Sequence, residues 1–240
     1  MRRPKPNAFL TLQNYNRLIS LHHVKKQSLP KNTLTPPKNM LIKGNKLNFF
    51  VVSLFPVYDR YIVEMEDFAA KMLADLHRFL LERGAVDERW PECPDVEEKW
   101  PAIAEAYLPD GAREFANYPV ASLGWMMFVA MALTKFWDED WEKYSQEEKL
   151  YEQLRDKRGY DNLDEYILDE VLDVHGDAAE QMQNLVGDCA ERVKRALYRL
   201  DIEPGTADAF RAYVACLQCM YQTGIAVQLK AMGYHMTKLN

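Results

Sequence analysis

The longest run of apolar residues in the chain extends from Pro119 to Leu133, and Ser122 is its one clearly polar side chain. A helix that is apolar on all sides is a buried helix, not a surface one. The run is shorter than the ~20 apolar residues that a helix needs to cross a bilayer, and Asp138, Glu139 and Asp140 follow it closely. The pattern therefore predicts the central helix of a water-soluble helical bundle.

Apolar residues recur every three or four positions along most of residues 65–240, which predicts consecutive amphipathic helices. No alternating pattern typical of strands follows residue 64. The predicted fold class is therefore all-α, a multi-helix bundle. Its expected helices cover residues 66–83, 101–108, 119–144, 145–158, 162–175, 177–200 and 206–232.

Polar residues punctuate these helices. Ser145 and Glu148 are spaced as a capping box at a helix start, and Thr206 is placed to cap the last helix. That last helix has an apolar stripe and a second seam of small residues. Because small side chains let another helix approach closely, we expect it to be buried on two sides.

Residues 1–64 differ from the rest in composition. They contain 11 Lys/Arg and two acids, a net charge of +9, and six prolines. We expect a largely irregular N-terminal segment before a single all-α domain at residues 65–240. Its one apolar run, Leu47 to Val57, has the composition of a strand but no obvious partner strand.

Three interpretations of residues 1–64 remain open. They form a disordered basic tail whose apolar run docks on the body, or a targeting segment that begins at Met40. Alternatively they are a non-native extension, since A/T-rich untranslated DNA encodes such residues when it is read through.

The body has a net charge of −15, from 19 bases and 34 acids. This balance argues against general nucleic-acid binding, which depends on Lys/Arg contacts to phosphates. Four cysteines are too few for a disulfide scaffold of this length. Cys216 and Cys219 fall in the middle of an expected helix, among small apolar neighbours, so we interpret them as buried structural cysteines. Reduced thiols predict a cytoplasmic protein.

The most distinctive candidate chemistry is acidic: residues 138–177 contain 15 acids against five bases. Glu139 and Glu142 are three residues apart, and so are Glu170 and Asp173. This spacing puts two carboxylates on one side of a helix, and carboxylate oxygens are ligands that Mg²⁺ prefers. These four residues resemble the ExxE…ExxD pattern of the all-α nucleotide pyrophosphatases. The resemblance covers only them, and it implies bound Mg²⁺ or Mn²⁺ that binds substrate phosphates and helps to activate water.

Two functions from different classes follow. The first is a binding or protein-interaction module, in which the acidic, aromatic-rich region at 136–175 receives a basic partner surface or a second copy of the chain. It needs no cofactor, and it involves neither nucleic acid nor membrane. The alternative is a divalent-metal-dependent phosphohydrolase using Glu139, Glu142, Glu170 and Asp173. That alternative requires the four carboxylates to converge within about 6 Å of a common point.

Overall fold

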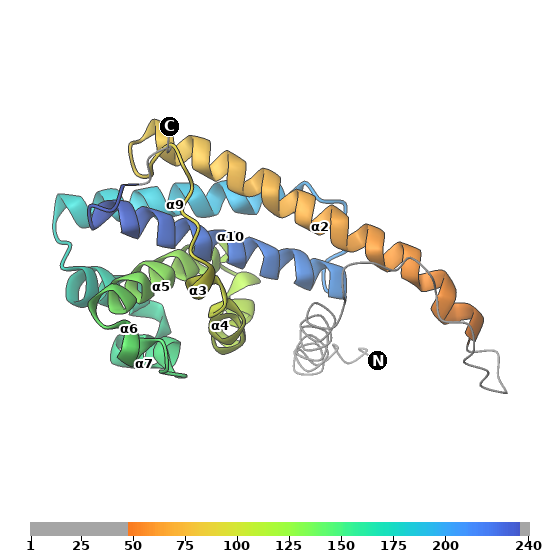
Figure 1. The fold of residues 1–240 in the computed structure, drawn as a ribbon, viewed down its shortest axis with the longest axis horizontal. Helices are drawn as coiled ribbons and strands as arrows, with labels where there is room; N and C mark the ends of the chain where they lie inside the picture. Colours follow the sequence, from red (N-terminus) through yellow and green to blue (C-terminus); the bar gives the residue numbers. More distant parts are fainter. Residues whose placement is uncertain (1–47, 236–240) are drawn as a thin grey trace. The chain divides into compact units, whose positions relative to one another are not determined.

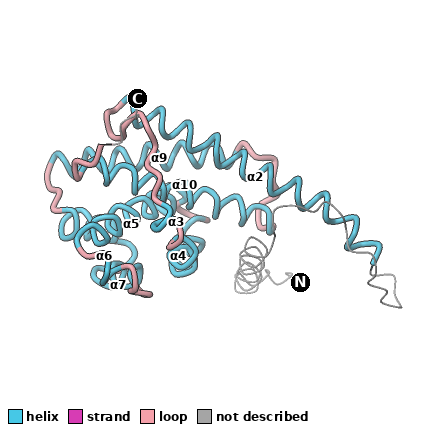
Figure 2. Tube along the Cα trace, in the orientation of Figure 1, coloured by secondary structure: helices cyan, strands magenta, loops and turns pink. Residues whose placement is uncertain are grey.

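The computed structural model describes residues 48–235, with side chains from Met65 onward. The chain divides into two units, residues 1–57 and 58–240, and the packing described below lies within the second. Within residues 48–235 every regular element is helical (Figure 2), so the predicted all-α fold is confirmed. In chain order the helices are α2 (Asn48–Glu82), α3 (Pro94–Glu97), α4 (Trp100–Phe115), α5 (Pro119–Glu139), α6 (Trp141–Tyr144), α7 (Leu150–Arg158), η1 (Tyr160–Asn162), α8 (Leu163–Tyr166), η2 (Ile167–Leu172), α9 (Asp177–Tyr198) and α10 (Ala207–Ala231).

Helix α5 is the centre of the second unit. It packs against α10, α9 and α4 (Figure 1). Every residue from Ser122 to Thr134 is buried except Trp125, which is half-buried. Among the described residues, α5 is also the one helix long and apolar enough to cross a membrane by length and composition alone, but 72% of its apolar window is buried inside the unit. The predicted buried central helix is therefore confirmed.

The contact between α5 and α10 is close because of one glycine. A Cβ added at Gly224 would lie 2.4 Å from the carbonyl oxygen of Met127 and 2.8 Å from the Cβ of Ala130. The small residues of α10, including Cys216 and Cys219, are buried. The expected burial of this helix on two sides is confirmed.

A polar network crosses the apolar core. The Ser122 hydroxyl donates to the carbonyl oxygen of Gly111 at 2.8 Å and lies 2.6 Å from the hydroxyl of Tyr213. The hydroxyl of Tyr107 donates to the carbonyl oxygen of Ser122 at 2.5 Å. These bonds hold the end of α4 against α5, so α4 continues through Pro109 to Phe115. The predicted end at residue 108 was wrong because this tertiary contact outweighs the local effect of proline.

The start of α2 also differs from the prediction. Residues 1–47 lie outside the described residues, so the irregular segment predicted for residues 1–64 is not described there. From Asn48 the chain is helical, so the strand-like interpretation of the apolar run was wrong over residues 48–57, and Leu47 lies outside the described residues. Aromatic and β-branched residues favour strands only weakly, and context routinely overrides that preference.

Helix ends were predicted with mixed success. Thr206 accepts a hydrogen bond from the backbone N–H of Ala209, as expected. Gly84, Gly159 and Gly233 follow helices with positive φ. Ser145 instead ends α6, and α7 begins at Leu150. The Glu147 carboxylate accepts from the backbone N–H of Lys149, so a local turn replaces the expected capping box.

Candidate functional site

An irregular helical segment between α7 and α9 forms the most unusual backbone of the second unit. Leu163, Ile167 and Val171 are buried, and η2 packs against α5. The turn η2 is π-helical, and Asp173 after it has a left-handed φ of 55°. Both conformations are unfavourable for ordinary residues and are frequent at functional sites.

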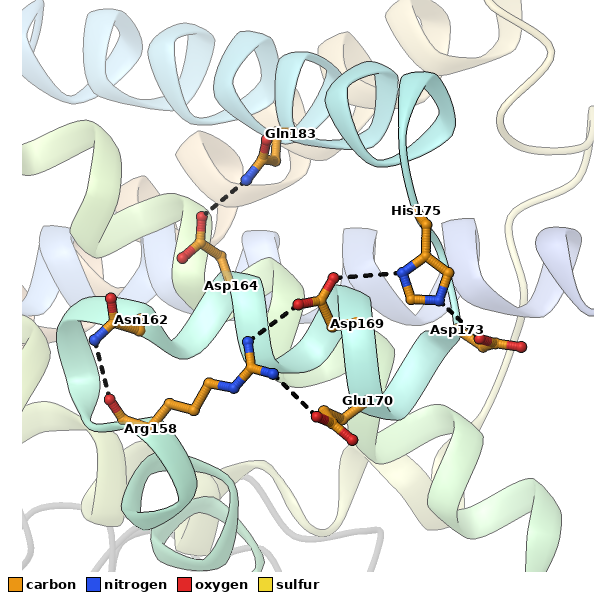
Figure 3. Close-up of polar contacts among 8 residues, drawn as sticks. All are labelled: Arg158, Asn162, Asp164, Asp169, Glu170, Asp173, His175 and Gln183. Atoms are coloured by element: carbon orange, nitrogen blue, oxygen red, sulfur yellow. Dashed lines mark hydrogen bonds and ion pairs between the residues drawn. The ribbon is translucent and has the colours of Figure 1, made fainter.

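Two basic side chains, Arg158 and His175, contact the carboxylates of this segment (Figure 3). Arg158 donates to Asp169 at 3.0 Å and to Glu170 at 2.9 Å. His175 lies 2.9 Å from Asp173 and 3.4 Å from Asp169. The hydrogen bond to Asp173, and then the one to Asp169, raise the pKa of His175. Three carboxylates on the surface thus share Arg158 and His175 as partners.

Glu139 and Glu142 do not share a helix. The predicted helix over 119–144 breaks at Asp140, whose φ of −157° and ψ of 87° are extended and whose carboxylate accepts from the backbone N–H of Lys143 at 3.0 Å. The continuous helix was wrong because an aspartate side chain can cap a new turn instead of continuing the old one. Glu139 lies 3.9 Å from Lys135, and Glu142 lies on the exposed face of α6.

Glu170 and Asp173 lie in and just after η2, where Arg158 and His175 contact them. Among residues 65–235, no three or more His, Cys, Asp or Glu side chains are grouped so that they could hold a metal ion. The magnesium or manganese site at Glu139, Glu142, Glu170 and Asp173 therefore stays a prediction that the described side chains do not support, and no hydrolytic step follows from them.

A groove of about 550 Å³ lies beside this segment, between the first half of α5 and the middle of α9. Its apolar lining includes Trp125, Phe128 and Val186. Its polar lining includes Asp164, to which Gln183 donates at 3.4 Å (Figure 3), and Lys194, which pairs with Glu191 at 2.5 Å. The volume is in the usual range of ligand sites, roughly 300–1,000 Å³. Sequence reasoning missed the groove because its walls are some sixty residues apart in the chain.

Gly187 lines this groove from the interior of α9. A Cβ at Gly187 would meet nothing within 4 Å, so packing does not require a glycine there. Glycine in a helix interior is about 1 kcal/mol less favourable than alanine. By contrast, a Cβ at Gly124 would lie 3.2 Å from Val186. Gly187 therefore leaves the groove open at this point, although alanine there would make α9 more stable.

The buried polar network supports the wall of the groove. The Trp125 ring packs edge-on against Tyr160 at 4.4 Å between centroids, and the hydroxyl of Tyr160 lies 3.2 Å from that of Tyr107. Burial raises the pKa of both phenols, so they stay protonated at neutral pH. Ser122, the isolated polar residue in an apolar run, was the one sequence signal of this network.

The aromatic residues expected at the surface pack mainly on one another. Phe136 stacks on Tyr144 at 5.0 Å between centroids, and Trp137 is buried. Trp141 is the most exposed of this group, at 40%. The aromatic rings of the region at 136–175 are therefore largely internal.

Comparisons of the chain with protein-family models, with curated proteins and with solved structures returned no match. The functional conclusion below depends on the residues of this chain alone.

Proposed function

We propose that the chain is a protein-interaction module that binds a positively charged helical surface of a partner protein. The observation that supports this proposal is the continuity of an apolar groove with an acidic margin. Asp164 belongs to both: it lines the groove and lies in the segment between α7 and α9. An apolar hollow beside a charged rim is the usual anatomy of a protein-binding surface.

The negative charge of the margin indicates a partner with a positively charged surface. Residues 159–180 contain eight acids and no Lys or Arg, and Arg158 contacts only two of them. Complementary Lys and Arg side chains would speed association and set its register. Such pairs are screened by salt, with a Debye length of about 10 Å at 0.1 M.

The groove provides the apolar contact. A side chain such as leucine on the partner helix fits a hollow lined by Trp125, Phe128 and Val186 and open beside Gly187. Buried anchors of this kind supply most of the affinity of an interface, whereas exposed charge pairs supply selectivity. Changes in the groove should therefore alter the affinity, whereas changes in the acidic margin should alter the salt dependence of binding.

We also propose a cytoplasmic location. Its support is that Cys93, Cys189, Cys216 and Cys219 are all unpaired, which suits a reducing compartment.

The test uses a synthetic amphipathic helical peptide of Leu and Lys, with a Leu/Glu peptide as its counterpart. The acidic-face variant combines Asp161→Lys, Asp164→Lys and Glu165→Lys. The matched control makes the same change in net charge at other exposed acids: Glu82→Lys, Glu98→Lys and Glu203→Lys.

We expect the wild type and the control to bind the basic peptide at low salt, and the acidic-face variant to bind at least tenfold more weakly. Gly187→Leu should also weaken binding, but without changing its salt dependence. Equal binding of the basic peptide by the acidic-face variant and the control would refute the proposed function.

A further inference from the structure

A second hollow lies between α2 and the end of α9, with a volume of about 290 Å³. Its floor is apolar and includes Phe68, Met72 and Val193. Its rim is strongly basic, since four cations face a single acid, Asp75, giving a net charge of +3 in the lining. The four cations are Lys71, Arg192, Arg195 and Arg199. A basic hollow is unexpected on a body whose net charge is −15.

The cations of this hollow are held in place but remain accessible. Arg192 lies 4.0 Å from the centroid of the Phe79 ring and donates to Asp75 at 3.3 Å. Lys71 and Arg195 contact acids on their own helices, yet their side chains are 75% and 65% exposed. Exposed pairs of this kind exchange readily with other anions, because each contributes little. The hollow can therefore receive a carboxylate-rich protein surface.

The chain itself has such a surface. The acidic segment at residues 159–180 ends within the first turn of α9, whereas the basic hollow begins at Arg192. Twelve residues of helix separate Glu180 from Arg192, which is about 18 Å at 1.5 Å per residue. This distance is too great for direct pairing along α9 within one copy, but the two surfaces can meet between two copies.

We propose that the partner of this module is a second copy of the same chain, and that the basic hollow of one copy receives the acidic segment of the other. This inference rests on the proposed function, and it names the partner. Each copy contributes both surfaces, so the contact closes as a two-fold dimer or continues from copy to copy. Because the pairs are exposed, the association weakens as salt rises.

The test measures the mass of the full-length protein in solution by light scattering and sedimentation, at roughly 20 mM and roughly 300 mM salt. The acidic-face variant defined above is compared with a hollow variant that combines Lys71→Glu, Arg195→Glu and Arg199→Glu. Arg192 is left intact because it packs on Phe79. The Glu82, Glu98 and Glu203 variant again controls for the change in net charge of the acidic-face variant.

We expect the wild type and the control to associate at low salt and to dissociate at high salt. Each variant alone should be monomeric, because the acidic-face variant reduces the net charge of residues 159–180 from −8 to −2, and the hollow variant reverses the net charge of the hollow lining from +3 to −3. An equimolar mixture of the two variants should associate again, because the acidic-face variant keeps the basic hollow and the hollow variant keeps the acidic segment. Helical circular dichroism equal to that of the wild type confirms that each variant is folded.

A wild type that is monomeric at low salt, or a mixture that stays monomeric, would overturn the inference. So would association that the acidic-face variant loses but the hollow variant keeps, because the basic surface would then lie elsewhere in the chain. The peptide experiment separates this failure from that of the proposed function. A monomeric wild type that binds the Leu/Lys peptide through its acidic segment leaves the function standing and excludes the second copy as the partner.

Discussion

Two glycines inside helices should respond to alanine with opposite signs. At Gly224 of α10, a Cβ would lie 2.4 Å from the carbonyl oxygen of Met127, and real contacts of this kind are essentially never shorter than 3.0 Å. The contacted atom belongs to the backbone of α5 and cannot rotate away. The two helices must therefore separate by more than half an ångström for alanine to fit.

The expected size follows from two opposing effects. Overpacking a core typically costs about 1–3 kcal/mol, and the second short approach, 2.8 Å to the Cβ of Ala130, favours the upper half of that range. Alanine regains about 1 kcal/mol through helix propensity. Gly224→Ala should therefore destabilise the protein by about 1–2 kcal/mol, which for this length lowers Tm by roughly 2–8 °C.

Gly187→Ala is the matched control, because its Cβ would meet nothing within 4 Å. The propensity gain of up to about 1 kcal/mol should remain, and it raises Tm by roughly 2–4 °C. Urea unfolding followed by circular dichroism measures both variants, with an unchanged m value as the sign of an intact two-state transition. If Gly224→Ala were as stable as the wild type while Gly187→Ala gained stability, α5 and α10 would not pack as described.

Ser122→Ala should lower the free energy of unfolding by about 1–3 kcal/mol, because it removes a buried hydrogen-bond partner. Tyr213→Phe should then cost less stability in the Ser122→Ala protein than in the wild type. If urea unfolding shows that the two losses add, the two side chains do not share a network. Burial raises the pKa of the Cys216 thiol strongly and that of the Cys93 thiol less. A thiol reagent should therefore modify Cys93 in the native protein and Cys216 only after unfolding. Mass spectrometry of the labelled peptides measures both reactions. The raised pKa of His175 means that its protonation favours the folded state: its contribution is fully present below the unfolded pKa of about 6.5 and is lost as pH rises through the folded value. The difference in Tm between the wild type and His175→Gln should therefore shrink as pH increases, and a difference that grows with pH would show that the imidazole is not held by its neighbouring carboxylates.

Residues close together in the sequence were sufficient to predict most of the helices and several of their ends. The all-apolar run at Pro119–Leu133 has no polar face, so the pattern of residues alone predicted a buried helix. Gly84 and Gly233 end helices because a left-handed residue closes the last turn at little cost when it is glycine. These features depend on neighbours within one or two turns, and periodicity reports such neighbours directly.

The positions of the candidate site residues depended on distant parts of the chain. Glu139 and Glu142 have the spacing of a shared helical face, but Asp140 caps a new turn between them. A continuous helix and a break at Asp140 are both favourable for the local sequence. The groove beside Trp125 and the basic hollow around Arg192 exist because α9 packs between segments that are 60 to 120 residues away in the chain. Helical periodicity identifies which face of a helix is buried. It contains no information on which other helix buries that face, and the helix pairing places acids, cations and cavities side by side.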